Sequence, residues 1–131
     1  MENRLYRLIN NFGSPYSDER ETYSDYLDFQ EALKDYKDII ADNISIDRAE
    51  RYEMEPYFII SDEAESNPGG EWRWCRMRTN DGEFCNIRIE PIQAHEAEYF
   101  ASEDIKAKYD AIYGFGNDST SLFTRLFKRK K

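Results

Sequence analysis

No run of about 18 apolar residues occurs in the 131-residue sequence, which excludes a membrane-spanning helix. The N-terminal stretch also lacks the long apolar segment of a signal peptide, so we expect a cytoplasmic protein. Cysteine is scarce. Cys75 and Cys85 are too few for a disulfide scaffold, and no second Cys or His pair completes the spacing of a zinc site. Both cysteines are therefore predicted to be free, buried thiols.

Motifs of catalysis and cofactor binding are missing as well. The sequence has no nucleophile elbow and no dinucleotide fingerprint, and its Pro-Gly-Gly stretch at 68–70 lacks the Gly-Lys-Ser/Thr of a phosphate-binding loop. The spacing of the surrounding Glu63, Glu65 and Glu71 matches no Ca²⁺ loop. The single histidine, His95, has no Ser or Cys at motif spacing and is predicted to be a surface residue. We expect no enzyme, no metal and no cofactor.

Positive charge is also in short supply, with 18 Lys and Arg residues against 27 Asp and Glu residues and a net charge of −9. Five of the 18 cations fall in the last seven positions, so the rest of the chain is more acidic still. This balance disfavours covering nucleic acid with a basic surface. Aromatic residues reach 15% and argue against disorder, and the length suits one domain.

Hydrophobic periodicity predicts helices in the first third of the chain and near its end. Apolar side chains recur at the spacing of one helical face over residues 2–12, and again over residues 22–42. A short helix is predicted at 46–54, ended by the proline that follows. Ser102 is expected to cap a further helix.

Between these helices, short aromatic and β-branched runs predict strands at about 57–61, 71–79 and 83–90. The last two are joined by the hairpin signal Asn-Asp-Gly at 80–82. If the glycine takes the left-handed position of a three-residue loop, Met77 faces Cys85. A two-residue turn would shift the pairing by one residue. We prefer the first register because it separates polar from apolar side chains.

The predicted fold class is therefore α+β: N-terminal helices, a small antiparallel β-meander of about three strands, and a C-terminal helix. Residues 1–118 form one domain in this prediction, and residues 119–131 form a basic amphipathic tail. Three interpretations of the tail are open: packing on the body, lying on an anionic membrane, or binding a partner as the Leu-Phe pentamers of sliding-clamp ligands do. The tail residues concerned are Leu122, Phe123, Leu126 and Phe127.

Two surfaces are candidates for partner binding. An acidic face is predicted on the helix over 22–42, and the alternative is a merely solvated helix face. Its residues are Glu21, Asp25, Asp28, Glu31, Asp35, Asp38 and Asp42. A Trp and Arg face is predicted on the hairpin, unless helices cover it and the Trp residues are core. Its residues are Trp72, Trp74, Arg76, Arg78 and Arg88.

We therefore expect a non-enzymatic accessory protein whose acidic helix engages a basic protein partner, possessing the size and charge of inhibitors and immunity proteins of phages and mobile elements. The alternative is a nucleic-acid or replication-associated binding module that uses the Trp and Arg face with the basic tail. Salt dependence and the choice of competitor separate these two functions.

Overall fold

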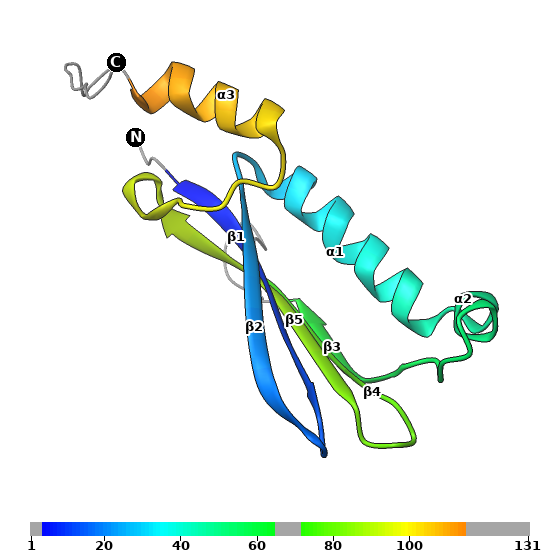
Figure 1. Ribbon diagram of the computed structural model, residues 1–131. Coiled ribbons are helices and arrows are strands. Elements are labelled where there is room, and N and C mark those ends of the chain that lie inside the picture. Colours follow the sequence, from blue (N-terminus) through cyan, green and yellow to red (C-terminus); the bar gives the residue numbers. More distant parts are fainter. Residues whose placement is uncertain (1–3, 65–71, 115–131) are drawn as a thin grey trace. The chain divides into compact units, whose positions relative to one another are not determined.

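The computed structural model describes residues 4–64 and 72–114 and forms two units, residues 1–99 and residues 100–131. In the first unit, five strands form one antiparallel sheet in the order β2-β1-β5-β4-β3 (Figure 1). The strands are β1 Arg4–Ser14, β2 Ser17–Tyr26, β3 Phe58–Ala64, β4 Arg73–Arg78 and β5 Phe84–Gln93.

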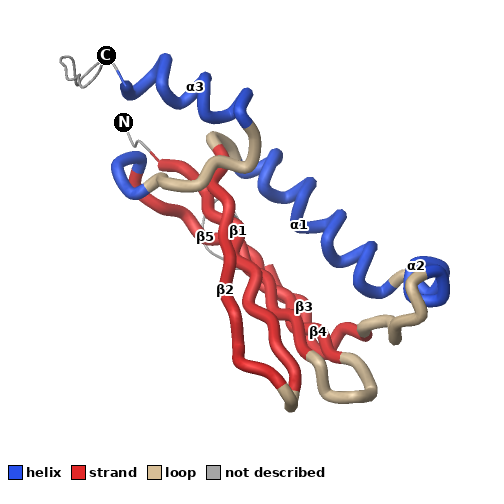
Figure 2. The backbone as a smooth tube through the Cα atoms, viewed as in Figure 1, coloured by secondary structure: helices blue, strands red, loops and turns tan. Residues whose placement is uncertain are grey.

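A single 3₁₀ turn, η1 Ala94–Glu96, follows β5, and two helices of the first unit lie between β2 and β3 in the sequence. They are α1 Phe29–Ile44 and α2 Ile46–Arg51, and Figure 2 shows α1 running along the sheet. In the second unit, α3 Glu103–Tyr113 begins as predicted at Ser102, whose hydroxyl accepts a hydrogen bond from the backbone N–H of Ile105 at 3.2 Å. Among the described helices, none is long and apolar enough to cross a membrane.

The predicted succession of N-terminal helices and then a meander is wrong, because residues 4–26 form the β1–β2 hairpin. β1 lies between β2 and β5 and has buried residues on both of its faces. Leu5 and Ile9 are buried on one face, and Leu8 is buried on the other. A strand that is covered on both sides buries residues of either parity, so its apolar positions can copy the spacing of a helical stripe.

The helix predicted from residue 22 starts later, at Phe29. The side chain of Asp28 accepts a hydrogen bond from the backbone N–H of Glu31 at 2.9 Å and so caps the first turn. Tyr26 ends β2 and is buried three positions before Phe29. The three-residue interval from Tyr26 to Phe29 matches one helical turn. The apolar spacing of a helix therefore continues backwards from α1 into the end of β2.

The hairpin register is confirmed, since Met77 lies opposite Cys85. Gly82 has a φ of +94°, in the left-handed region that glycine adopts at little cost. The backbone N–H of Thr79 donates to the carbonyl of Glu83 at 2.9 Å, and the N–H of Gly82 donates to the carbonyl of Thr79 at 3.1 Å. The loop therefore has three residues, and the two-residue alternative is wrong.

Directly paired residues of antiparallel strands share a face of the sheet, so the pairing defines two faces. The helix face carries α1, and its buried residues include Tyr6, Leu8, Tyr26, Cys75, Met77, Cys85, Ile87 and Ile89. Tyr6 meets Phe29 of α1 edge-on, with ring centroids 5.7 Å apart. The opposite face, here the outer face, alternates with it along every strand. It carries Trp74, Arg76 and Arg78 of β4.

Candidate binding surface on the outer face of the sheet

The predicted acidic row does not lie on one helix. Glu21 and Asp25 belong to β2, whereas Asp28 precedes α1 and only the last four acids lie within it. Because β2 is a strand, Glu21 and Asp25 cannot share a helix face with the acids of α1. Asp25 is also fully buried, with 0% of its surface exposed. It is therefore unavailable to a partner.

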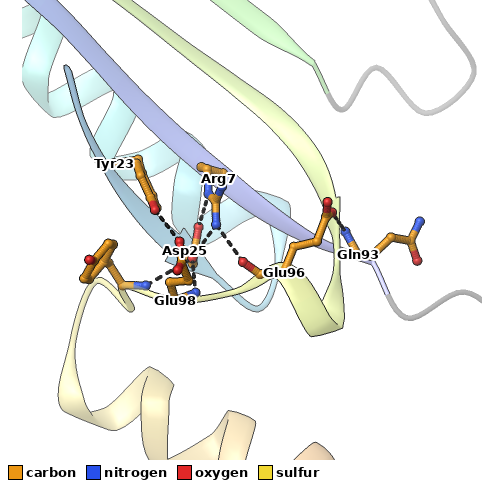
Figure 3. A network of polar contacts seen from close by, with 7 residues as sticks. Arg7, Tyr23, Asp25, Gln93, Glu96 and Glu98 are labelled. Carbon is orange, nitrogen blue, oxygen red and sulfur yellow. Dashed lines mark hydrogen bonds and ion pairs between the residues drawn. The ribbon is translucent and has the colours of Figure 1, made fainter.

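Asp25 instead closes a network on the outer face (Figure 3). Its carboxylate accepts two hydrogen bonds from Arg7, from Nε at 2.8 Å and from Nη2 at 3.2 Å. It accepts two more from the backbone N–H groups of Glu98 at 2.7 Å and Tyr99 at 3.2 Å. The hydrogen bond to Asp25 raises the pKa of Arg7 above its ordinary value. The network ties the segment after β5 to β1 and β2.

Further contacts hold the same guanidinium in place. Arg7 Nη2 donates to the carbonyl of Glu96 at 2.9 Å, and the guanidinium lies 4.0 Å from the ring centroid of Tyr23. The Tyr23 hydroxyl donates to the Glu98 carboxylate, which raises the pKa of Tyr23. Every group of this network is engaged within the fold, so we assign it a structural role rather than a binding role.

The acids of α1 are partly engaged too. Asp35 accepts a hydrogen bond from the Tyr26 hydroxyl at 2.7 Å, and burial together with this bond raises the pKa of Tyr26. Asp38 lies 3.4 Å from Lys34 Nζ in an exposed ion pair. Asp35, Asp38 and Asp42 line a groove of about 290 Å³ between α1 and β2. Asp28 acts as the cap, and Glu31 lies one turn before Asp35.

The Trp and Arg residues, in contrast, share one face as predicted. On β4 and β5, Trp74 lies opposite Arg88, Arg76 opposite Asn86, and Arg78 opposite Phe84. All of these residues therefore lie on the outer face of the sheet, whereas α1 covers the helix face. Trp72 directly precedes β4 and, like Trp74, is half-buried. Arg76 and Arg78 are exposed.

The three arginines of this face differ in their electrostatic surroundings. Arg88 lies 3.3 Å from Glu90 and 3.8 Å from Glu21, so two carboxylates compensate its charge. Arg76 and Arg78 form no ion pair with any residue of the described ranges 4–64 and 72–114. These two guanidiniums remain available to an acidic group from outside.

A shallow depression of about 360 Å³ adjoins these two arginines. Its wall is formed by Asn11, Glu19, Ile60, Arg76, Arg78, Phe84 and Asn86, together with Met77 and Gly82. The Phe84 ring packs close against Gly13, where a Cβ atom would lie 3.0 Å from the ring. The surface thus combines two arginines that form no ion pair with a described residue, one carboxylate, amides and an aromatic ring, and we call it the Arg76–Arg78 surface.

Sequence reasoning missed the residues that β1, β2 and β3 contribute to this surface. Asn11 is predicted to lie in a helix, so its position beside β5 was missed; Glu19 of β2 is assigned to no element, and Ile60 only to a strand. The turn residues Gly13-Ser14-Pro15 between the two strands were the available signal for a hairpin.

The remaining candidates give no site within the described residues. His95 is exposed in η1, and no group of three or more potential metal ligands occurs in the ranges 4–64 and 72–114. Both cysteines are buried and free, as predicted, and burial raises the pKa of Cys75 to about 11. The side chains of Glu63, Glu65 and Glu71 and the four apolar tail residues lie outside the described part.

Comparison with known proteins adds no relationship: no family model, no curated protein and no solved structure matches the chain.

Proposed function

We propose that this chain is an accessory protein that acts by binding another protein, and that the Arg76–Arg78 surface makes the contact. The observation that carries the proposal is the pair of exposed guanidiniums of Arg76 and Arg78, which form no ion pair with another residue of the described part of an otherwise acidic chain. Arg and Trp are enriched among the residues that dominate binding energy at protein interfaces. The partner is expected to offer Asp or Glu side chains to these two arginines.

This proposal differs from the acidic helix inferred from the sequence. Asp25 is buried, Asp28 caps α1, and Asp35 is hydrogen-bonded, so a continuous acidic row is absent from the described structure. Neutralising these residues would affect folding as well as any binding, because capping and buried hydrogen bonds stabilise the fold. Arg76 and Arg78 have no such conflict between roles, because they form no ion pair with another described residue.

A nucleic-acid ligand fits the Arg76–Arg78 surface less well. Proteins that bind DNA commonly contact six to ten phosphates, roughly one cation each. On this face, Arg88 is already paired with two carboxylates, and Glu19 accepts a hydrogen bond from Asn11 at 2.7 Å beside the depression. Two free cations surrounded by carboxylates favour a protein partner with matched charges.

The proposal can be tested by comparing captured proteins. The wild-type chain and an R76E/R78E variant serve as bait in host lysate, and mass spectrometry identifies what each retains. The control, R51E/K106E, makes the same change of charge at two exposed cations that do not line the depression. We expect a partner that the wild type and the control retain and that R76E/R78E loses, with affinity reduced at least about thirtyfold.

Direct measurements with the purified partner then decide the question. Equal affinity of R76E/R78E and wild type would refute the proposal. Salt-sensitive binding of a labelled single-stranded oligonucleotide by wild type, lost in R76E/R78E, would replace it with the nucleic-acid alternative.

A further inference from the structure

One edge of the sheet carries exposed apolar side chains. β3 is an edge strand, and Phe58, Ile59 and Ile60 are 44%, 41% and 47% exposed. The other edge strand, β2, is exposed along residues 17–22, where it is rich in charged side chains. Charge on an edge strand discourages pairing with another chain, whereas an apolar edge invites it. The two edges of this sheet are therefore not equivalent.

A groove on the helix face lies beside this apolar edge. It has a volume of about 450 Å³ and is lined on α1 by Leu33, Tyr36, Lys37, Ile40, Ala41 and Ile44, and on the strands by Asp62 and Arg73. Five strands at about 4.8 Å spacing make a sheet roughly 20 Å wide, and one helix covers only about 10 Å of it. α1 reaches β3 where the Tyr36 hydroxyl donates to Asp62 at 3.2 Å, and the groove lies open beside this contact.

We infer that this edge is the contact with a second copy of the same chain, in which the two β3 strands pair antiparallel and join the sheets. A two-fold axis perpendicular to a sheet makes any edge strand antiparallel to its own copy, which matches the pairing within this sheet. It also places the 58–60 stretches against each other. The result is a continuous sheet of two copies, a common form of strand addition.

Charge complementarity supports a second copy as the occupant. The backbone N–H of Tyr57 donates to the carbonyl of Asn43 at 2.8 Å, which joins the start of β3 to the end of α1. Antiparallel pairing sets this end of one copy opposite the Asp62 end of the other, where Lys37 lines the groove. Glu53 and Glu55 shortly precede β3, so these two acids of one copy approach a groove of the other that holds two cations, Lys37 and Arg73, and one acid, Asp62.

The available apolar area is also sufficient. Seven of the ten exposed large apolar residues in the described part fall between Ile44 and Ile60. Their exposed fractions correspond to on the order of 600 Å² per copy, and a standard interface buries ~800 Å² per partner when its polar rim is included. Three of the seven lie on β3 itself, and the other four lie on α1, on α2 and in the stretch before β3.

Sedimentation velocity tests the inference on the full chain. We expect wild type to change from a 15.6 kDa species to one of twice that mass between about 1 and 100 µM. Ile60→Lys places a charge at the centre of the contact and should raise the dimer dissociation constant at least about tenfold. The matched control is Ile112→Lys on α3, which is 63% exposed and should leave the constant unchanged.

Hydrogen exchange provides a second measurement that does not depend on a variant. Backbone amides of residues 58–62 should exchange more slowly at the high protein concentration than at the low one, while those of β2 should not change. A wild type that stays monomeric at about 100 µM would overturn the inference and assign the edge to a different partner. A dimer that Ile60→Lys leaves intact, or that Ile112→Lys disrupts equally, would overturn it as well.

Discussion

Replacing Asp25 by Asn tests the network that holds the segment after β5 on the outer face. The substitution keeps the shape of the side chain but removes its charge, and one of the two oxygens becomes an N–H₂ group facing donors. Arg7 and two backbone N–H groups then lose an acceptor. Removing one member of a buried ion pair costs about 3–5 kcal/mol. The side chain of Arg7 is 17% exposed and retains some access to water, so we expect about 3 kcal/mol.

Urea unfolding followed by circular dichroism measures this loss. The control is Asp38→Asn, which removes an exposed carboxylate 3.4 Å from Lys34 and should cost no more than about 0.5 kcal/mol. We also expect the amides of Glu98 and Tyr99 to exchange faster in the Asp25→Asn variant, because their acceptor is weakened. A free energy of unfolding within about 1 kcal/mol of wild type would refute the argument that this carboxylate is the anchor of the segment.

Three further substitutions or conditions test other parts of the structure. Gly82→Ala should lower the free energy of unfolding by about 1 kcal/mol or more, because the residue has φ +94° and a Cβ atom would lie 2.9 Å from Pro15; an unchanged value by urea unfolding would contradict the loop geometry. Ile87→Ala should cost about 2–5 kcal/mol in the same assay, because the side chain is 1% exposed, and a cost below about 1 kcal/mol would contradict its burial. Stability should fall as pH rises from about 9 towards 11, since the pKa values of Cys75 and Cys85 are raised in the folded state and the unfolded chain releases protons first; rapid alkylation of the native thiols at pH 8 would contradict this prediction.

The sequence predicted the β4–β5 hairpin well because its information is local. A glycine at the left-handed position fixes the loop, and strict alternation fixes which side chains share a face. The face holding Trp74, Arg76 and Arg78 followed from that register alone. Ser102 also gave the start of α3 correctly, because a cap acts on the turn beside it.

The N-terminal third could not be predicted in the same way. Whether residues 4–14 form a helix or a strand depends on β5, which pairs with them from far along the chain. Leu5, Leu8 and Ile9 have no signal of their own that distinguishes a helical stripe from a strand buried on both faces. The acidic row failed for the same reason, since its first two members belong to the strand next to β1.

The position of β1 also has a consequence for the order of folding. The sheet consists of two pieces with local pairing, the β1–β2 hairpin and the β3–β4–β5 meander, and only the β1–β5 pairing joins them. Arg4 lies opposite Gln93, so joining the pieces closes most of the first unit into a loop. Loop closure of this length carries an entropic cost before any contact compensates it, and folding slows as contacts become more distant in sequence. We therefore expect the union of the two pieces to limit the rate of folding. Until it occurs, the apolar edges of β1 and β5 both remain open to pairing with other chains.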